Sequence, residues 1–144
     1  MIKNACAFLV ALFSLYAPNI FAQKNDDADI QLVLHNQEKA WNDGDLEGFM
    51  KGYWKSDSLM FVGKSGITYG WQKTLDNYKK GYPDTAAMGK LLFDILEMKP
   101  VSEDTHFIIG KWQLIRSIGN IGGYFSLLFK KINGEWLIIC DHTS

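Results

Sequence analysis

An acid and a base, Asp141 and His142, directly follow an apolar stretch at residues 137–140. Histidine ionises close to neutral pH, which makes His142 the candidate general base of a proton-transfer reaction. Arg116 carries a guanidinium fork of the kind that binds a carboxylate through two parallel hydrogen bonds. These residue types indicate that the protein binds a small molecule through its polar end, or transfers a proton to or from it.

Three aromatic residues extend this candidate site: Trp54, Tyr78 and Trp112. Their rings can line an apolar cavity and their polar atoms can bond to a ligand, although each would also suit an ordinary core. Asp141 has a structural alternative as well, in which it holds the C-terminal residues or an arginine. The expected ligand-binding set is Trp54, Tyr78, Trp112, Arg116, Asp141 and His142, and His142 is also the expected catalytic residue.

Nothing in the sequence points to a metal or another cofactor. The three histidines lie on separate predicted elements, without the close spacings that metal sites favour. The glycine-rich stretch at residues 119–123 falls between two strands and not before a helix, so it is not the pattern of a phosphate-binding loop. We therefore expect a site with no metal and no cofactor.

A hairpin turn sets the direction in which the end of the chain points. Asn133 and Gly134 are typical of a two-residue type I′ turn. Counting outward from this turn gives the pairs Phe129 with Ile138, Leu127 with Cys140, and Phe125 with His142. Opposed residues share a sheet face, so this register predicts that His142 points inward and Asp141 points away. A local bulge would reverse the two.

Hydrophobic periodicity predicts helices first and strands afterwards. Helical spacing of apolar residues covers residues 30–41, 46–53 and 71–82. Strands are expected at residues 58–63, 90–98, 105–117, 124–132 and 135–143. We expect a loose polar lead-in at residues 24–29, a turn at 64–66 and a flexible connector at 119–123. This order predicts an α+β domain in which a bent antiparallel sheet carries the helices on one face.

Either face of the strand at residues 105–117 could be the buried one. The even-numbered positions include Trp112 and Leu114, so we expect that face to point inward and to place Arg116 near the strand end. The alternative places Lys111 inside.

The first 22 residues have the layout of a secretory signal peptide. Lys3 supplies a positive start, an apolar run of about a dozen residues follows, and Ala22 is a small residue before a cut. A membrane span needs roughly 20 apolar residues, which disfavours an uncleaved anchor. We expect a signal peptide at residues 1–22 and one domain at residues 23–144 of a periplasmic or secreted protein without stable membrane insertion.

The charge balance gives no reason to expect a nucleic-acid partner. Cleavage would remove Lys3 from the 15 basic residues and leave 14 against 16 acidic ones, a formal charge of −2 with no basic run. Cys140 would be the only remaining cysteine, so no disulfide can form within the chain. Stability must therefore come from a hydrophobic core.

Several short motifs resemble the SnoaL-like group of the nuclear transport factor 2-like superfamily, and within it a bacterial branch of unknown function. The resemblance covers about residue 30 to the end and includes the stretches "AWNDGDLEGFMKGYW" and "NGEWLIICDHTS". The matching positions are Tyr53-Trp54, Gly70-Trp71, Tyr78, Tyr82-Pro83, Met88-Gly89, Gly110-Lys111-Trp112, Arg116, Gly122-Gly123, Phe125 and Asp141-His142.

The resemblance implies a cone-shaped domain in which three N-terminal helices pack on a curved antiparallel sheet around a deep pocket. It also implies a homodimer formed through the outer sheet face, for which Tyr124, Leu128, Leu137 and Ile139 are candidates. The carboxylate base of the ketosteroid isomerase-like members has no counterpart at residues 58–63.

Three functions are compatible with these residues. The leading hypothesis is an exported binder of a small, partly apolar molecule, with an anionic one as an option, held by aromatic rings and by Arg116 with His142. The second is an isomerase, dehydratase or cyclase with His142 as general base. The third is a non-catalytic dimerisation module.

Overall fold

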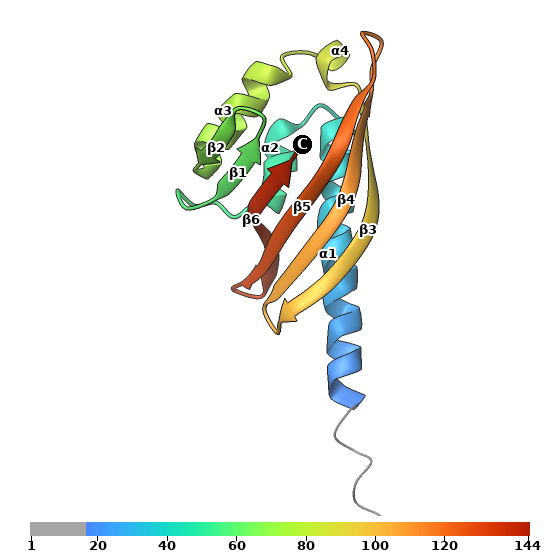
Figure 1. The fold of residues 1–144 in the computed structure, drawn as a ribbon, viewed down its shortest axis with the longest axis vertical. Coiled ribbons are helices and arrows are strands. Elements are labelled where there is room, and N and C mark those ends of the chain that lie inside the picture. The colour runs from blue at the N-terminus through green and yellow to red at the C-terminus, as the bar shows by residue number, and fades with distance from the viewer. Residues whose placement is uncertain (1–16) are drawn as a thin grey trace, which may run out of the picture.

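A curved sheet wraps around helices in the computed structural model, which describes residues 17–144, with side chains from Asn25 onward (Figure 1). The predicted signal peptide at residues 1–22, with its cut after Ala22, falls outside the part of the chain described at the level of side chains. Within the described part, no helix has both the length and the apolar character needed to cross a membrane.

The element order confirms an α+β fold. The helices are α1 (Ala17–Asn42), α2 (Leu46–Phe49), the 3-10 turn η1 (Met50–Gly52), α3 (Trp71–Gly81) and α4 (Thr85–Met88). The strands are β1 (Met60–Gly63), β2 (Gly66–Tyr69), β3 (Lys90–Ser102), β4 (Thr105–Ile115), β5 (Ile121–Ile132) and β6 (Glu135–Thr143). They form one sheet in the order β2-β1-β6-β5-β4-β3, antiparallel except for the parallel pair β1 and β6.

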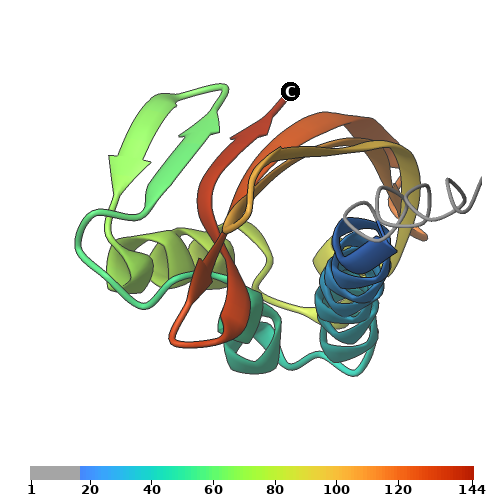
Figure 2. The same cartoon turned by 90° about the horizontal axis from the view of Figure 1, so that it is seen from below.

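The sheet bends around α1, as the view from below shows (Figure 2). The face of α1 that meets the sheet carries the residues that helical periodicity selects, with Ile30, Leu34, Gln37 and Trp41 all buried. Burial of such an apolar stripe is what fixes a helix of this kind to a sheet.

The loose lead-in expected at residues 24–29 is wrong, because these residues belong to α1. The acidic side chain of Asp26 binds the sheet. Asp26 Oδ1 accepts hydrogen bonds from Lys131 Nζ at 2.7 Å and from Trp136 Nε1 at 3.0 Å. A polar stretch therefore continues the helix because it has charged and polar partners at the end of the sheet.

The sequence did not predict two short elements, β2 and α4. β2 pairs with β1 across the turn expected at residues 64–66, and α4 precedes β3. Both have only four residues, too few to show a period. The connector expected at residues 119–123 is also shorter than predicted, because β5 already begins at Ile121.

β4 turns its even-numbered face inward, as predicted. His106, Ile108, Gly110 and Leu114 are buried on that face. Gly110 is needed there because a Cβ at this position would lie 2.3 Å from the ring of Phe125.

The hairpin of β5 and β6 follows the predicted register only as far as the pair Phe129 and Ile138. A β-bulge then adds Ile139 to β6, so that two of its residues lie opposite one residue of β5. The pairs beyond the bulge are Leu128 with Cys140, Leu127 with Asp141, Ser126 with His142, and Phe125 with Thr143. The predicted pairs of Leu127 with Cys140 and of Phe125 with His142 are therefore wrong.

The bulge reverses the two polar side chains at the end of the chain. Asp141 now points inward and is only 4% exposed, whereas His142 is exposed to solvent. A shift of one residue moves every later side chain to the opposite face of a sheet. This single irregularity decides which group enters the interior.

Candidate functional site

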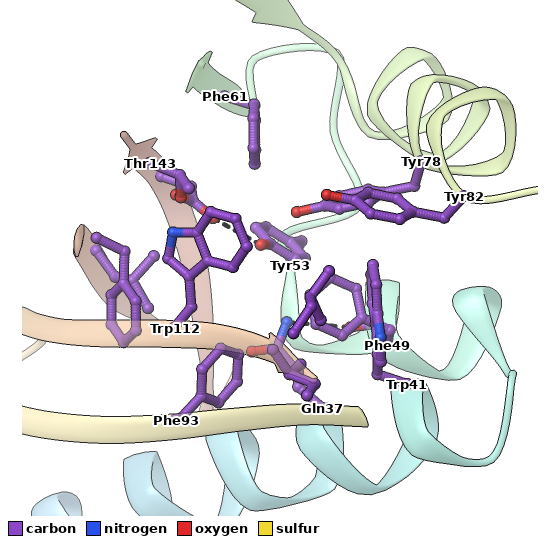
Figure 3. A pocket seen from close by; sticks show the side chains of 15 residues that line it. Gln37, Trp41, Phe49, Tyr53, Phe61, Tyr78, Tyr82, Phe93, Trp112 and Thr143 are labelled. Atoms are coloured by element: carbon purple, nitrogen blue, oxygen red, sulfur yellow. Dashed lines mark hydrogen bonds between the residues drawn. The ribbon is translucent and has the colours of Figure 1, made fainter. Parts of the chain in front are cut away.

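An aromatic pocket opens between the end of β6, the C-terminal half of α1 and the end of α3 (Figure 3). It has a volume of about 100 Å³. Apolar and aromatic side chains make up most of its wall, and one carboxylate and a few neutral polar groups complete it. The lining residues are Gln37, Trp41, Phe49, Tyr53, Phe61, Tyr78, Tyr82, Leu91, Phe93, Trp112, Leu114, Phe125, Leu127, Asp141 and Thr143.

The aromatic rings form a connected cluster with defined geometry. Trp41 meets Tyr82 edge to face at a centroid distance of 4.8 Å, and it meets Phe49 in the same way at 5.2 Å. Tyr78 lies edge to face against Phe61 at 5.7 Å and stacks on Tyr82 at 6.1 Å. Each such pair adds about 0.5–1.5 kcal/mol beyond the burial of its area, so the wall is held in place before any ligand arrives.

Asp141 is the polar centre of the pocket. The hydroxyl of Tyr53 donates to its Oδ2 at 2.7 Å, and the hydroxyl of Thr143 donates to its Oδ1 at 2.6 Å. Tyr53 reaches this position because it follows η1 and pairs with Ile138 of β6 in an isolated bridge. Thr143 lies two residues beyond Asp141 on the same strand and therefore on the same face.

Burial controls the ionisation of these groups. It raises the pKa of Asp141 to about 6, against the opposing effects of the Thr143 and Tyr53 hydrogen bonds and the nearby His142. Burial, and next the charge of Asp141, hold the pKa values of the Tyr53 and Tyr78 phenols well above the usual one. At neutral pH the pocket therefore contains protonated phenols and a carboxylate that is close to its titration range.

Two further polar groups belong to the pocket wall. Gln37 Nε2 donates to the carbonyl oxygen of Phe49 at 3.1 Å, which ties α1 to α2. Trp112 Nε1 is buried and has no hydrogen-bond partner among the described residues. Figure 3 shows the Trp112 ring across the pocket from Tyr78 and Tyr82, whose hydroxyl groups point toward it.

Three of the six predicted site residues, Tyr78, Trp112 and Asp141, line this pocket and the other three do not. Trp54 lies beyond the wall, with its backbone N–H donating to Ile138. The Arg116 guanidinium donates to the carbonyl oxygens of Gly119 at 2.8 Å and Ala87 at 3.4 Å.

His142 lies on the outer face, in register with Val62 of β1. The expectation that it points inward is wrong, and the bulge at Ile139 is the reason. Lys111, the alternative inward residue of β4, is exposed with its Nζ 5.4 Å from the ring centre of Tyr124.

Sequence reasoning did not select Tyr53, Thr143 or Gln37 as site residues. One signal was present for Gln37, which is a polar residue on the apolar face of a predicted helix. Tyr53 is among the positions that carry the family resemblance, but nothing local linked it to Asp141, which lies 88 positions away in the sequence. Thr143 would have followed from Asp141 if the bulge had been foreseen.

The described residues contain no group of three or more His, Cys, Asp or Glu side chains placed to hold a metal ion. The chemistry available in the pocket is therefore that of one carboxylate, its hydroxyl donors and the surrounding rings.

Comparison with solved structures shows a similarity in sequence as well as in fold. The chain is 41% identical to a nuclear transport factor 2-like protein of unknown function from Shewanella oneidensis MR-1. The alignment covers 83% of this chain and 98% of the other, with a TM-score of 0.80. No family model matches the chain, and no curated protein does.

More distant structures share the fold. A protein of unknown function with a cystatin-like fold from Nostoc punctiforme is 14% identical over 83% of this chain and 76% of its own, with a TM-score of 0.71. A type 2 hexachlorocyclohexane dehydrochlorinase is 15% identical over 87% of this chain and 88% of its own, with a TM-score of 0.69.

Proposed function

The chain belongs to the nuclear transport factor 2-like family, and from this premise we propose that it is a small-molecule-binding domain whose ligand occupies the aromatic pocket beside Asp141. One observation carries the proposal. The pocket combines a preformed apolar wall with a buried carboxylate at its polar end. Apolar cavities with a few convergent polar groups are the usual form of a ligand site.

The polar cluster favours a ligand over an ordinary core. A buried carboxylate costs free energy unless it is paired, and Asp141 has two neutral hydroxyl donors and no cation in the pocket wall. The unpartnered Trp112 Nε1 adds a second cost of the same kind. A fold selected for stability alone would be expected to place apolar side chains at these positions.

The polar end of this site differs from the one expected from sequence. Arg116 and His142 were the expected anchors, but both lie outside the pocket wall. Asp141, Tyr53 and Tyr78 take their place in the proposal. The group that faces the ligand is then an acid and not a pair of bases.

A second candidate is an enzyme that transfers a proton, of the isomerase, dehydratase or cyclase type. The observation in its favour is a buried carboxylate in the pocket wall, Asp141, which two hydroxyl groups hold in place. Its pKa of about 6 suits a general base working near neutral pH. The base would then be Asp141 and not His142. Loss of turnover with retained binding in Asp141→Asn would support the enzyme, whereas absence of turnover on any bound ligand would support the binder.

The five tryptophans provide a direct test of the binding proposal. Trp41 and Trp112 line the pocket, whereas Trp54 and Trp136 do not. In ¹H–¹⁵N spectra recorded with a mixture of neutral, cationic and anionic fragments, we expect the indole signals of Trp41 and Trp112 to shift. Those of Trp54 and Trp136 serve as internal controls. No response from Trp41 and Trp112 to any fragment would contradict the proposal.

An unbiased test complements the spectra. Native mass spectrometry of the purified protein should detect a co-purified small molecule that is released on denaturation. The same molecule, added back, should shift the Trp112 indole signal. A co-purified molecule that leaves this signal unchanged would place binding elsewhere.

A further inference from the structure

The charge of the pocket wall restricts what it can bind. Asp141 is the only one of the 15 described lining residues whose side chain ionises near neutral pH, and no lysine, arginine or histidine is among them. The predicted site contained two basic side chains, and neither belongs to the pocket wall. Arg116 binds backbone carbonyls, and His142 is exposed on the outer face. When Asp141 is ionised, the pocket wall therefore carries one negative charge and no positive one.

The carboxylate also keeps free bonding capacity. A carboxylate has about four lone-pair positions, and the Tyr53 and Thr143 hydroxyls occupy two of them. Both donors are neutral, so neither balances the charge. Burial without a cation is the cause of the raised pKa of about 6. A positively charged ligand would supply the missing partner.

The aromatic wall also favours a positively charged ligand. Nine of the lining side chains are aromatic: Trp41, Phe49, Tyr53, Phe61, Tyr78, Tyr82, Phe93, Trp112 and Phe125. The faces of such rings carry partial negative charge and attract cations within about 6 Å. Tyr82 and Phe49 meet Trp41 edge to face at 75° and 69°, so walls of different orientation enclose the space. The ionised carboxylate of Asp141 would repel an anion.

The volume limits the size of the bound group. A cavity of about 150 Å³ holds benzene with its six carbon atoms, so about 100 Å³ admits a group of roughly four or five non-hydrogen atoms. A methylated ammonium head has this size. The rest of a longer ligand would have to extend through the open side of the pocket.

From these observations we propose that the ligand is a small organic cation, whose ammonium head lies between Asp141 and the aromatic rings. This inference rests on the proposed binding function and adds the charge of the ligand to it. It replaces the anionic option among the partly apolar ligands expected from sequence, because Arg116 and His142, which were expected to hold an anion, are outside the pocket wall.

Three probes of nearly equal size separate the charge of the ligand from its shape. Tetramethylammonium is the cation, tert-butanol its neutral isostere, and isobutyrate the anion. Titrations at pH 8 followed by the Trp112 indole signal should show tetramethylammonium binding about tenfold or more tightly than tert-butanol, with no binding of isobutyrate. Equal or tighter binding of tert-butanol or isobutyrate would overturn the cation inference and leave the binding function intact. If none of the three binds, the cation inference fails, and the fragment spectra decide whether the binding function also fails.

A substitution tests whether Asp141 is the group that binds the cation. Asp141→Asn should weaken tetramethylammonium binding by about 10- to 100-fold and change tert-butanol binding by less than about threefold. Asp94→Asn is the matched control, because Asp94 is exposed on β3 and lies outside this pocket. Unchanged tetramethylammonium binding in Asp141→Asn would overturn the inference.

The wild-type protein allows the same test without a variant, should Asp141→Asn fail to fold. Tetramethylammonium is charged at every pH, so its affinity should fall as the pH drops from 8 to 5 and Asp141 takes up a proton. Tert-butanol binding should stay constant. The titratable side chains facing Asp141 are the phenols of Tyr53 and Tyr78, which stay protonated in this range. His142 is the charged neighbour, so His142→Ala must keep the pH profile. A flat profile for tetramethylammonium contradicts the inference.

Discussion

Asp141 owes its properties to the side chains around it and not to its neighbour in sequence. The Tyr53 and Thr143 hydroxyls hold its two oxygens, and burial raises its pKa to about 6. His142, the more obvious catalytic residue by type, is exposed on the opposite face. The residue types predicted a site near the end of the chain. Whether Asp141 or His142 belongs to that site depends on which of the two side chains points inward.

The raised pKa of Asp141 makes folding stability depend on pH. The folded pKa of about 6 exceeds the value of about 3.9 for an unfolded aspartate, so the folded state binds the proton more tightly. This contribution is complete below about pH 4 and is lost as the pH rises through 6. We expect the free energy of unfolding to lose on the order of 3 kcal/mol between pH 4 and pH 7 in wild type, compared with Asp141→Asn.

Urea unfolding at a series of pH values measures this difference. Carboxylates elsewhere in the protein contribute equally to both proteins, so they cancel in the comparison. Asp94→Asn should follow wild type. Parallel profiles for wild type and Asp141→Asn would mean that Asp141 is solvated.

At the level of elements, the hairpin of β5 and β6 shows how far sequence reasoning extends. The Asn133-Gly134 turn predicted the register correctly through the pair Phe129 and Ile138. The bulge at Ile139 was not predictable, because residues 137–140 are apolar throughout and do not mark the position of an extra residue. What favours the bulge is tertiary, since it brings Asp141 to the Tyr53 hydroxyl.

At the start of α1, the sequence predicted too little structure. Residues 24–29 are polar and lack an apolar period, so they were expected to be loose. Their partners lie more than 100 positions away, at Lys131 and Trp136, and local pattern cannot reveal them. By contrast, the inward face of β4 and the later part of α1 were predictable, because burial there follows a simple period.

The contact of Asp26 with the sheet predicts a measurable loss of stability. Asp26→Ala would leave the buried Trp136 indole N–H and the Lys131 ammonium without this acceptor. We expect a loss of about 1–3 kcal/mol in the free energy of unfolding at pH 7. Asp29→Ala, at an exposed position of the same helix, should change it by less than about 0.5 kcal/mol. Equal effects of the two substitutions would contradict the anchoring role.

The effect of Asp26 should also depend on pH, with a sign opposite to that of Asp141. Burial alone would raise the pKa of Asp26, but the hydrogen bonds from Lys131 and Trp136 outweigh it and lower the pKa below its usual value. The stabilisation is then present above about pH 4 and lost as the pH falls through the folded pKa. The difference between wild type and Asp26→Ala should therefore shrink in acid.

For the molecule as a whole, the two faces of the sheet differ in burial. The inner face builds the core and the pocket, whereas the outer face carries Tyr124, Leu128, Leu137 and Ile139, with Tyr124 56% exposed. We propose that two copies of the chain associate through this outer face, as the sequence resemblance implied. Exposed apolar patches on a sheet commonly mark such contacts.

Light scattering coupled to size-exclusion chromatography tests the assembly. Wild type should have the mass of a dimer, and Tyr124→Lys should be a monomer with an unchanged circular dichroism spectrum. Tyr69→Lys is the matched control, because Tyr69 is equally exposed but lies on β2 at the far edge of the sheet. A monomeric wild type would contradict the proposal.

The inward position of Asp141 underlies the proposed ligand site, and one measurement tests this position directly. The side-chain carboxyl ¹³C signal of Asp141, followed by NMR as the pH is varied, should titrate with a pKa of about 6. Tyr53→Phe should move this value upward, because the variant loses a donor to the ionised form. A pKa at or below about 4, the value of a solvated aspartate, would mean that β6 has no bulge and that Asp141 faces away from the pocket.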